Sequence, residues 1–116
     1  MHEMSIAQSI LDLVVDEAAK AGLERVEEVR LRIGEMSGVV PDSLSLCWSL
    51  MSKEEAAGPA QGAALAIELI PVKAECRSCG HTFMVDNYDF SCPGCGSGET
   101  DILEGRDMTV ASIVGE

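Results

Sequence analysis

Two C-x-x-C-G sequences, separated by eleven residues, constrain this chain more than any other feature. The first reads CRSCG over residues 76–80 and the second reads CPGCG over residues 92–96. Each sequence places two sulfurs on one tight turn, and the glycine that follows lets the backbone turn back with its amides near the thiolates. Two such turns supply four soft anionic ligands, which suits a tetrahedral Zn²⁺ with Zn–S distances of about 2.3 Å. We therefore predict a zinc site formed by Cys76, Cys79, Cys92 and Cys95.

Three other interpretations of this cysteine-rich lobe have to be weighed. Disulfides are disfavoured because the chain has five cysteines, an odd number, and no secretory signal. An iron site of the rubredoxin type would use the same four-sulfur pattern and remains an alternative. A redox pair of the C-x-x-C type lacks the βαβ context that this motif needs. Four cysteines leave no open coordination position, so the pattern indicates a structural site rather than a catalytic one.

Composition limits the size of the fold and the kinds of partner. A chain of 116 residues with 47% hydrophobic content can form one modest core, but a lobe as small as the cysteine-rich stretch needs its metal to fold. The formal charge of −12, with only eight dispersed Lys and Arg, lacks the basic surface of a nucleic-acid binder. No stretch resembles a membrane span or a signal peptide, so we expect a cytoplasmic protein with no membrane association.

Hydrophobic periodicity predicts the elements around the lobe. Apolar residues at helical spacing predict a helix over 5–21, with Ser5 and Gln8 as a capping box and Gly22 as its end. A strand is expected over 25–34, a second helix over 41–51 beginning at a proline, and a long strand over 63–73. The stretches 100–104 and 108–114 alternate again, while 53–62 is expected to be a loop. Cys47, in the second helix, is expected to be a small buried hydrophobe.

These elements predict an α+β fold in which two helices pack on a small three-stranded sheet, with a zinc-ribbon lobe of four cysteine ligands inserted between two strands. The corresponding domain limits are 1–74 and 98–116 for the α+β domain and 75–97 for the zinc-binding insertion.

The amino terminus, Met1-His2-Glu3, offers a second kind of metal site. A free α-amine, the His2 amide nitrogen and the His2 imidazole can chelate one ion in fused rings. This tetragonal nitrogen ligation suits Ni²⁺ or Cu²⁺ rather than Zn²⁺, because the ion has to displace an amide proton. Glu3 could complete the site through its amide nitrogen or its carboxylate. By themselves, these three residues are a weak signal, because most histidines at such a position are simply exposed.

Taken together, the amino terminus and the paired cysteine turns closely resemble the HypA family of hydrogenase nickel-incorporation proteins, which includes HybF. The resemblance covers the full length of the chain. It is carried by the opening MHEMSIA, the stretch VRLRIGE over 29–35, the helix start VPDSL over 40–44, and the two cysteine turns.

The resemblance implies a nickel metallochaperone that is not an enzyme and that carries a structural zinc. It implies that nickel binds at the amino terminus, with His2 as the essential ligand, Met1 contributing its amine, and Glu3 contributing to or tuning the site. The four cysteines would hold zinc. The partners that it implies are the GTPase HypB, the large subunit of [NiFe]-hydrogenase and, for some members, urease maturation proteins.

Two further functions stay open on the sequence alone. One is a zinc-ribbon adaptor that binds other proteins without nickel, and the other is a rubredoxin-like iron electron carrier. An enzyme is not indicated, because no nucleophile–base pair, phosphate loop or pair of catalytic acids stands out. His81, next to the first cysteine turn, is either a bystander near the metal or an exchangeable zinc ligand.

Overall fold

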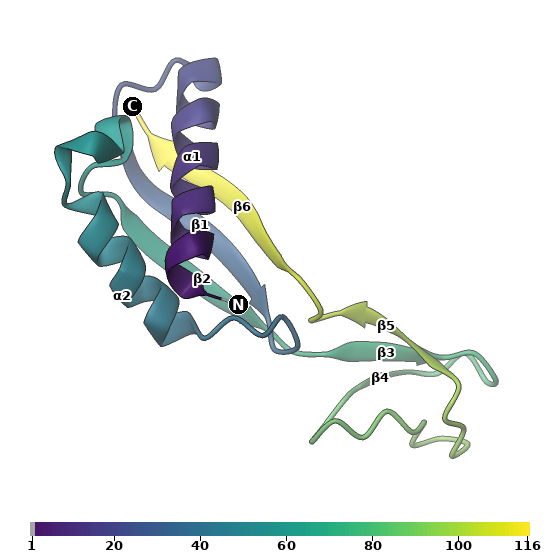
Figure 1. The fold of residues 1–116 in the computed structure, drawn as a ribbon. Helices are drawn as coiled ribbons and strands as arrows, with labels where there is room; N and C mark the ends of the chain where they lie inside the picture. The colour runs from purple at the N-terminus through teal and green to yellow at the C-terminus, as the bar shows by residue number, and fades with distance from the viewer. Residues whose placement is uncertain (1) are drawn as a thin grey trace.

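A computed structural model describes residues 2–116 of the chain. It is elongated, with principal extents of 55 × 26 × 16 Å, and has a two-layer body at one end and the cysteine-rich lobe at the other (Figure 1). The α+β class predicted from the sequence is confirmed. None of the helices in the described part of the chain is long and apolar enough to cross a membrane.

Helix α1 (Glu3–Ala21) begins two residues earlier than predicted. His2 occupies the N-cap position in an extended conformation, and the Ser5 and Ile6 amides donate to its carbonyl. The predicted capping box is wrong, because the Gln8 side chain donates to Asp12 one turn further on. The predicted end is confirmed at Gly22, whose φ of +70° is a left-handed conformation that glycine adopts without strain.

The body contains a three-stranded sheet in the order β2-β1-β6. The central strand β1 (Val26–Gly34) pairs in parallel with β2 (Ala64–Ile70) and antiparallel with β6 (Met108–Gly115). Along β1, Val29, Leu31 and Ile33 are buried, while Arg30 and Arg32 are exposed. The alternation follows from the two-residue period of a strand whose two faces meet different surroundings.

Helix α1 and helix α2 (Pro41–Ser52) cover the buried face of this sheet, and the short 3-10 helix η1 (Glu55–Ala60) occupies part of the stretch predicted to be a loop. Trp48 of α2 anchors this layer, because its indole N–H donates a 2.8 Å hydrogen bond to the carbonyl of Ala63. Cys47, expected to be buried, is half-buried against the same core.

The lobe has a sheet of its own, in the order β4-β3-β5, and both pairings are antiparallel. Its strands are β3 (Lys73–Cys76), β4 (Thr82–Met84) and β5 (Thr100–Glu104). The single strand predicted over 63–73 is therefore two strands, which separate at Pro71 and Val72 so that β2 belongs to the body and β3 to the lobe. The stretch 100–104 is extended as predicted, and its partner is β3.

The two sheets meet at a junction of close backbone contacts. The Gly34 amide donates to the carbonyl of Asp107 at 3.0 Å, and the Met36 amide donates to that of Gly105 at 2.8 Å. A Cβ on Gly34 would overlap the Gly105 carbonyl, and a Cβ on Gly105 would lie 2.7 Å from the Pro71 carbonyl oxygen. Glycine is therefore required at both positions by the close approach of three chain segments.

Candidate metal centre

The two cysteine turns have the same backbone hydrogen bonds. In the first, the Cys76 amide donates to the His81 carbonyl and the Gly80 amide donates to the Cys76 carbonyl, both at 2.9 Å. In the second, the Cys92 amide donates to Ser97 and the Gly96 amide donates back to Cys92. The glycine after each cysteine pair turns the backbone back, as predicted, and Gly80 and Gly96 do so in a left-handed conformation, with φ angles of +77° and +76°.

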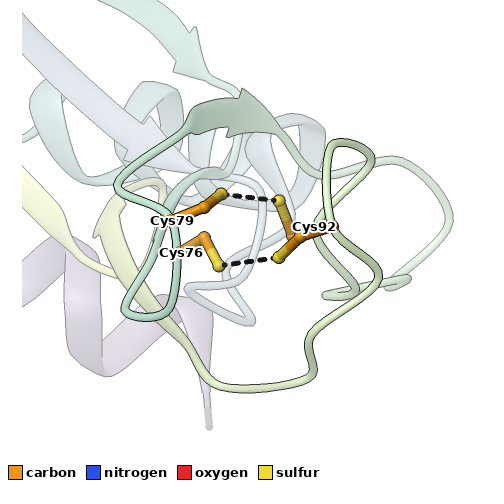
Figure 2. Close-up of side chains that lie close together, drawn as sticks. Cys76, Cys79 and Cys92 are labelled. Atoms are coloured by element: carbon orange, nitrogen blue, oxygen red, sulfur yellow. Dashed lines mark hydrogen bonds between the residues drawn. The ribbon is translucent and has the colours of Figure 1, made fainter.

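These turns bring the four sulfurs into one cluster (Figure 2). The Cys76–Cys95 and Cys79–Cys92 sulfurs are each 3.6 Å apart, and all four lie within 4.8 Å of one another. A tetrahedron with Zn–S distances of about 2.3 Å has sulfur–sulfur edges of about 3.8 Å. The cluster therefore has the size of a metal site with four cysteine ligands. All five cysteines are free rather than joined in disulfides.

Polar groups around the sulfurs favour an anionic cluster. The Gly94 amide donates a 3.3 Å hydrogen bond to the Cys92 sulfur. The backbone N–H of Cys79 lowers the pKa of the Cys76 thiol to about 6. Burial of Cys92 opposes its ionisation, but the N–H groups of Cys95 and Gly94 outweigh burial and lower its pKa. The pKa of two of the four thiols is thus lowered before any cation binds.

The other two sulfurs keep their protons in the absence of a cation. The N–H of His81 favours the Cys79 thiolate, but the adjacent Cys92 sulfur and partial burial prevail and raise the pKa of Cys79 to about 12. Likewise, the N–H of Ser97 is outweighed by the Cys76 sulfur and by burial, so the pKa of Cys95 is raised. Four thiolates this close repel one another, so a divalent cation is needed to ionise the whole set.

His81 lies beside the cluster. Its exposed imidazole stacks on Phe83, with ring centroids 6.2 Å apart and planes at 11°. The His81 ring is thus held against Phe83 and is not one of the four groups in the sulfur cluster.

The amino-terminal residues lie on the body. His2 is exposed, and Glu3 is the first residue of α1. The first four N–H groups of a helix have no carbonyl partner within the helix, so the Glu3 amide is not used by α1. Met1, the third predicted nickel ligand, lies outside the described residues.

His2 also lies at the end of an apolar groove that the sequence did not reveal. The groove is about 400 Å³ at this end and is formed by α1 and the edge strand β6. Helical periodicity marked Ile6 and Leu13 as members of the apolar face of α1, but it could not show that no other element covers them.

Comparisons with known proteins agree with this geometry. Residues 1–115 match the family model described as "Hydrogenase/urease nickel incorporation, metallochaperone, hypA". The hydrogenase maturation factor HypA of Desulfosudis oleivorans is 41% identical, over 97% of this chain and 96% of that protein. The factor of the same name from Chlorobium luteolum is 40% identical, over 98% and 95%.

Two solved structures share the fold. The solution structure of the Ni metallochaperone HypA from Helicobacter pylori has a TM-score of 0.71 and 28% identity, covering 99% of this chain and 97% of that one. A second solution structure, of a HypA protein, has a TM-score of 0.76 and 27% identity, covering 100% and 97%. Sequence, fold and cysteine cluster thus agree, and the chain belongs to the HypA family of metallochaperones for hydrogenase and urease nickel incorporation, which are maturation factors rather than enzymes.

Proposed function

We propose that this chain binds Ni²⁺ at its amino terminus and delivers it for the maturation of [NiFe]-hydrogenase, while a structural zinc holds the lobe. The observation that carries the nickel site is the position of His2. It is exposed at the N-cap of α1, so its imidazole is accessible to an ion, and its own amide has no carbonyl partner within the helix.

The proposed ligands form a chelate around the start of α1. The α-amine of Met1, the His2 amide nitrogen and the His2 imidazole supply three nitrogens, and the Glu3 amide or carboxylate supplies a fourth ligand. Nickel favours such tetragonal nitrogen sets. The positive end of the helix dipole opposes a cation at this place, and the Glu3 carboxylate offsets that opposition. Repulsion from the helix dipole and attraction to Glu3 thus oppose each other, which suits an ion that has to be bound and then released.

The proposed zinc site is closed. The sulfurs of Cys76, Cys79, Cys92 and Cys95 lie within 4.8 Å of one another and would supply all four ligands of a tetrahedral zinc, which would leave no free position for a substrate or water. Zinc would therefore stabilise the lobe and take no part in a reaction. We propose that the zinc-binding insertion, expected over 75–97, extends over 73–104, because β3 and β5 pair in the lobe sheet, and that 1–72 with 105–116 form the nickel-binding domain.

We propose a cytoplasmic protein that works with the GTPase HypB and the large subunit of [NiFe]-hydrogenase, and in some settings with urease maturation proteins. These partners follow from the family rather than from the described surface. The net charge of −12 supports protein partners over nucleic acid.

Nickel titration by calorimetry tests the proposed carrier site. Untagged protein with a free amino terminus is loaded with zinc and compared with His2→Ala and with His81→Ala, a matched control because the chain has only two histidines. We expect one nickel per chain, lost on His2→Ala or on acetylation of the amine, and retained in His81→Ala. Unchanged nickel stoichiometry and affinity in His2→Ala would exclude the proposed site. A red protein containing iron would instead favour the electron-carrier alternative.

A further inference from the structure

The groove that begins at His2 continues along the whole of α1. Two adjoining hollows of about 400 and 390 Å³ share Leu13 and Val110, so together they form one groove between α1 and β6. Its lining is mostly apolar: Ile6, Ile10 and Leu13 from α1, and Met108, Val110 and Ile113 from β6. In Figure 1, α1 and β6 lie side by side on the flank of the body away from α2.

The groove exposes part of the apolar face of α1. That face is expected to be covered, because its residues recur at helical spacing. Ala7, Ile10 and Val14 are buried, but Leu13 is 43% exposed, and Ala21, two turns further along the groove, is exposed as well. Within residues 2–116, no other element is placed over this part of the helix, so an apolar partner could bury it.

The floor of the groove is an edge strand that carries no charged residue and no proline. Strand β6 pairs with β1 on one side, and no described strand lies on its other side. Exposed edges normally carry charged residues or proline, which prevent another strand from pairing. The eight residues Met108–Gly115 contain neither, although about a quarter of the whole chain is charged. One irregularity is present, because the register against β1 shifts at Ala111, between the two hollows. The outer backbone groups of β6 are thus open to pairing.

We propose that this groove binds an extended segment of a partner protein, which adds to β6 as a fourth strand. Strand addition pairs the outward N–H and C=O groups of β6. On each side of the register shift at Ala111, alternate side chains of the segment, about 6.7 Å apart, point toward α1 and fill the hollow beside them. The segment therefore carries apolar, preferably β-branched, residues at every second position.

The negative charge of this protein favours a segment with basic residues on either side of its apolar stretch, and it disfavours a second copy of this chain. Glu17 is the only charged residue that lines the groove within the described chain. Asp12, Asp16 and Lys20 are exposed on the same helix, and Lys20 lies 3.1 Å from Asp16 and 3.7 Å from Glu17, so this group of charges is negative overall. Two copies would each bring a net charge of −12 to the contact. A segment flanked by lysine or arginine is complementary to this surface, so the proposed partner has basic residues beside its apolar strand.

The position of the groove relates the proposed docking to the proposed nickel site. His2 lines its first hollow, so a segment bound to β6 lies beside the amino terminus. Whether the partner then takes nickel rests on the function proposed above, whereas the docking itself does not.

A titration followed by NMR, with nickel-free, zinc-loaded protein, tests the docking. The probe is the peptide KKVTVTVTVKK, and its control is the same peptide with N-methyl groups on alternate backbone amides, which cannot pair with a strand edge. Two variants are compared: Leu13→Glu places a charge in the groove, and Leu46→Glu changes a residue of α2 that is 62% exposed and does not line the groove.

We expect peptide-induced shifts along β6 and the facing side of α1, with affinity reduced about tenfold or more in Leu13→Glu, as for a central interface residue, and unchanged in Leu46→Glu. The N-methylated peptide should not bind. No shifts at β6, or equal binding by the Leu13→Glu variant, would overturn the proposal. So would sedimentation showing that the free chain dimerises through the groove and that Leu13→Glu dissociates it. Nickel titration of the same variants is a separate readout, so loss of the carrier function and loss of docking can be told apart.

Discussion

The body and the lobe of this protein are stabilised in different ways. Among residues 2–116, the body buries fourteen hydrophobic residues in one cluster that joins both helices to the sheet. The lobe buries four, Ala74, Cys76, Phe83 and Cys92, and two of these are proposed zinc ligands. Burial of apolar surface therefore supports the body, whereas the lobe depends on its sulfur cluster.

This difference between the two regions agrees with the roles proposed for the two metals, a structural zinc in the lobe and a transient nickel on the body. An ion that holds a fold together has to stay, and the lobe places its ligands at the centre of its small core. A cargo ion has to leave, and the proposed nickel ligands lie at the end of a helix that is folded without them. Loss of the cargo should leave the body intact, while loss of zinc should not leave the lobe intact.

Removal of zinc should have the largest effect and should separate the two regions. We expect chelation, or the substitution Cys76→Ser, to collapse the amide chemical-shift dispersion of 73–104 and to leave the resonances of α1, α2 and β1 dispersed. Heteronuclear NMR before and after chelation measures both regions in one sample. Simultaneous unfolding of the body would show that the two regions form one cooperative unit and would contradict the comparison.

The junction sharpens the comparison, because it belongs to both regions. Gly34→Ala should destabilise the whole chain by about 3 kcal/mol, since its Cβ meets the backbone of Gly105, which cannot move aside as a flexible side chain could. Urea denaturation of zinc-loaded protein measures the loss. The control is Gly38→Ala, at φ +80° with no neighbour within 4 Å, which should cost only the conformational penalty of about 1 kcal/mol. Equal losses at the two positions would argue against tight packing at the junction.

Acid should act on the lobe through its thiols. Because the pKa values of Cys79 and Cys95 are raised, both are protonated near neutral pH without a cation and must lose their protons when zinc binds. At least two protons are thus released, and zinc affinity should fall by about a hundredfold for each unit that the pH is lowered near neutrality. Calorimetry in buffers of different ionisation enthalpy counts the protons. Release of fewer than one would contradict the assigned pKa directions.

The sequence predicted what depends on local pattern. Three features are each specified within a few residues, and the structure confirms them: the reversal of the backbone after each cysteine pair, the end of α1 at Gly22 and the alternation along β1. The predicted start of α1 was wrong because Ser5 and Gln8 fit a capping pattern equally well inside a helix, and nothing in the pattern shows that the preceding turn is already helical.

Pairing between distant residues could not be predicted. The alternation of 100–104 indicates a strand but does not name its partner, and the break between β2 and β3 depends on how Pro71 packs against Gly105. The groove was missed for the same reason. Spacing showed which residues of α1 are apolar, but only the edge position of β6 shows that Leu13 is left uncovered.

Two short chain crossings connect the two sheets, and together they fix the distance between the two ends of the molecule. Only Pro71 and Val72 separate β2 from β3, only residues 105–107 separate β5 from β6, and both crossings are tied to the end of β1. The distance from the sulfur cluster to the amino terminus is therefore set by these backbone contacts and not by the length of a flexible linker. A protein that engages both ends at once has to match that length.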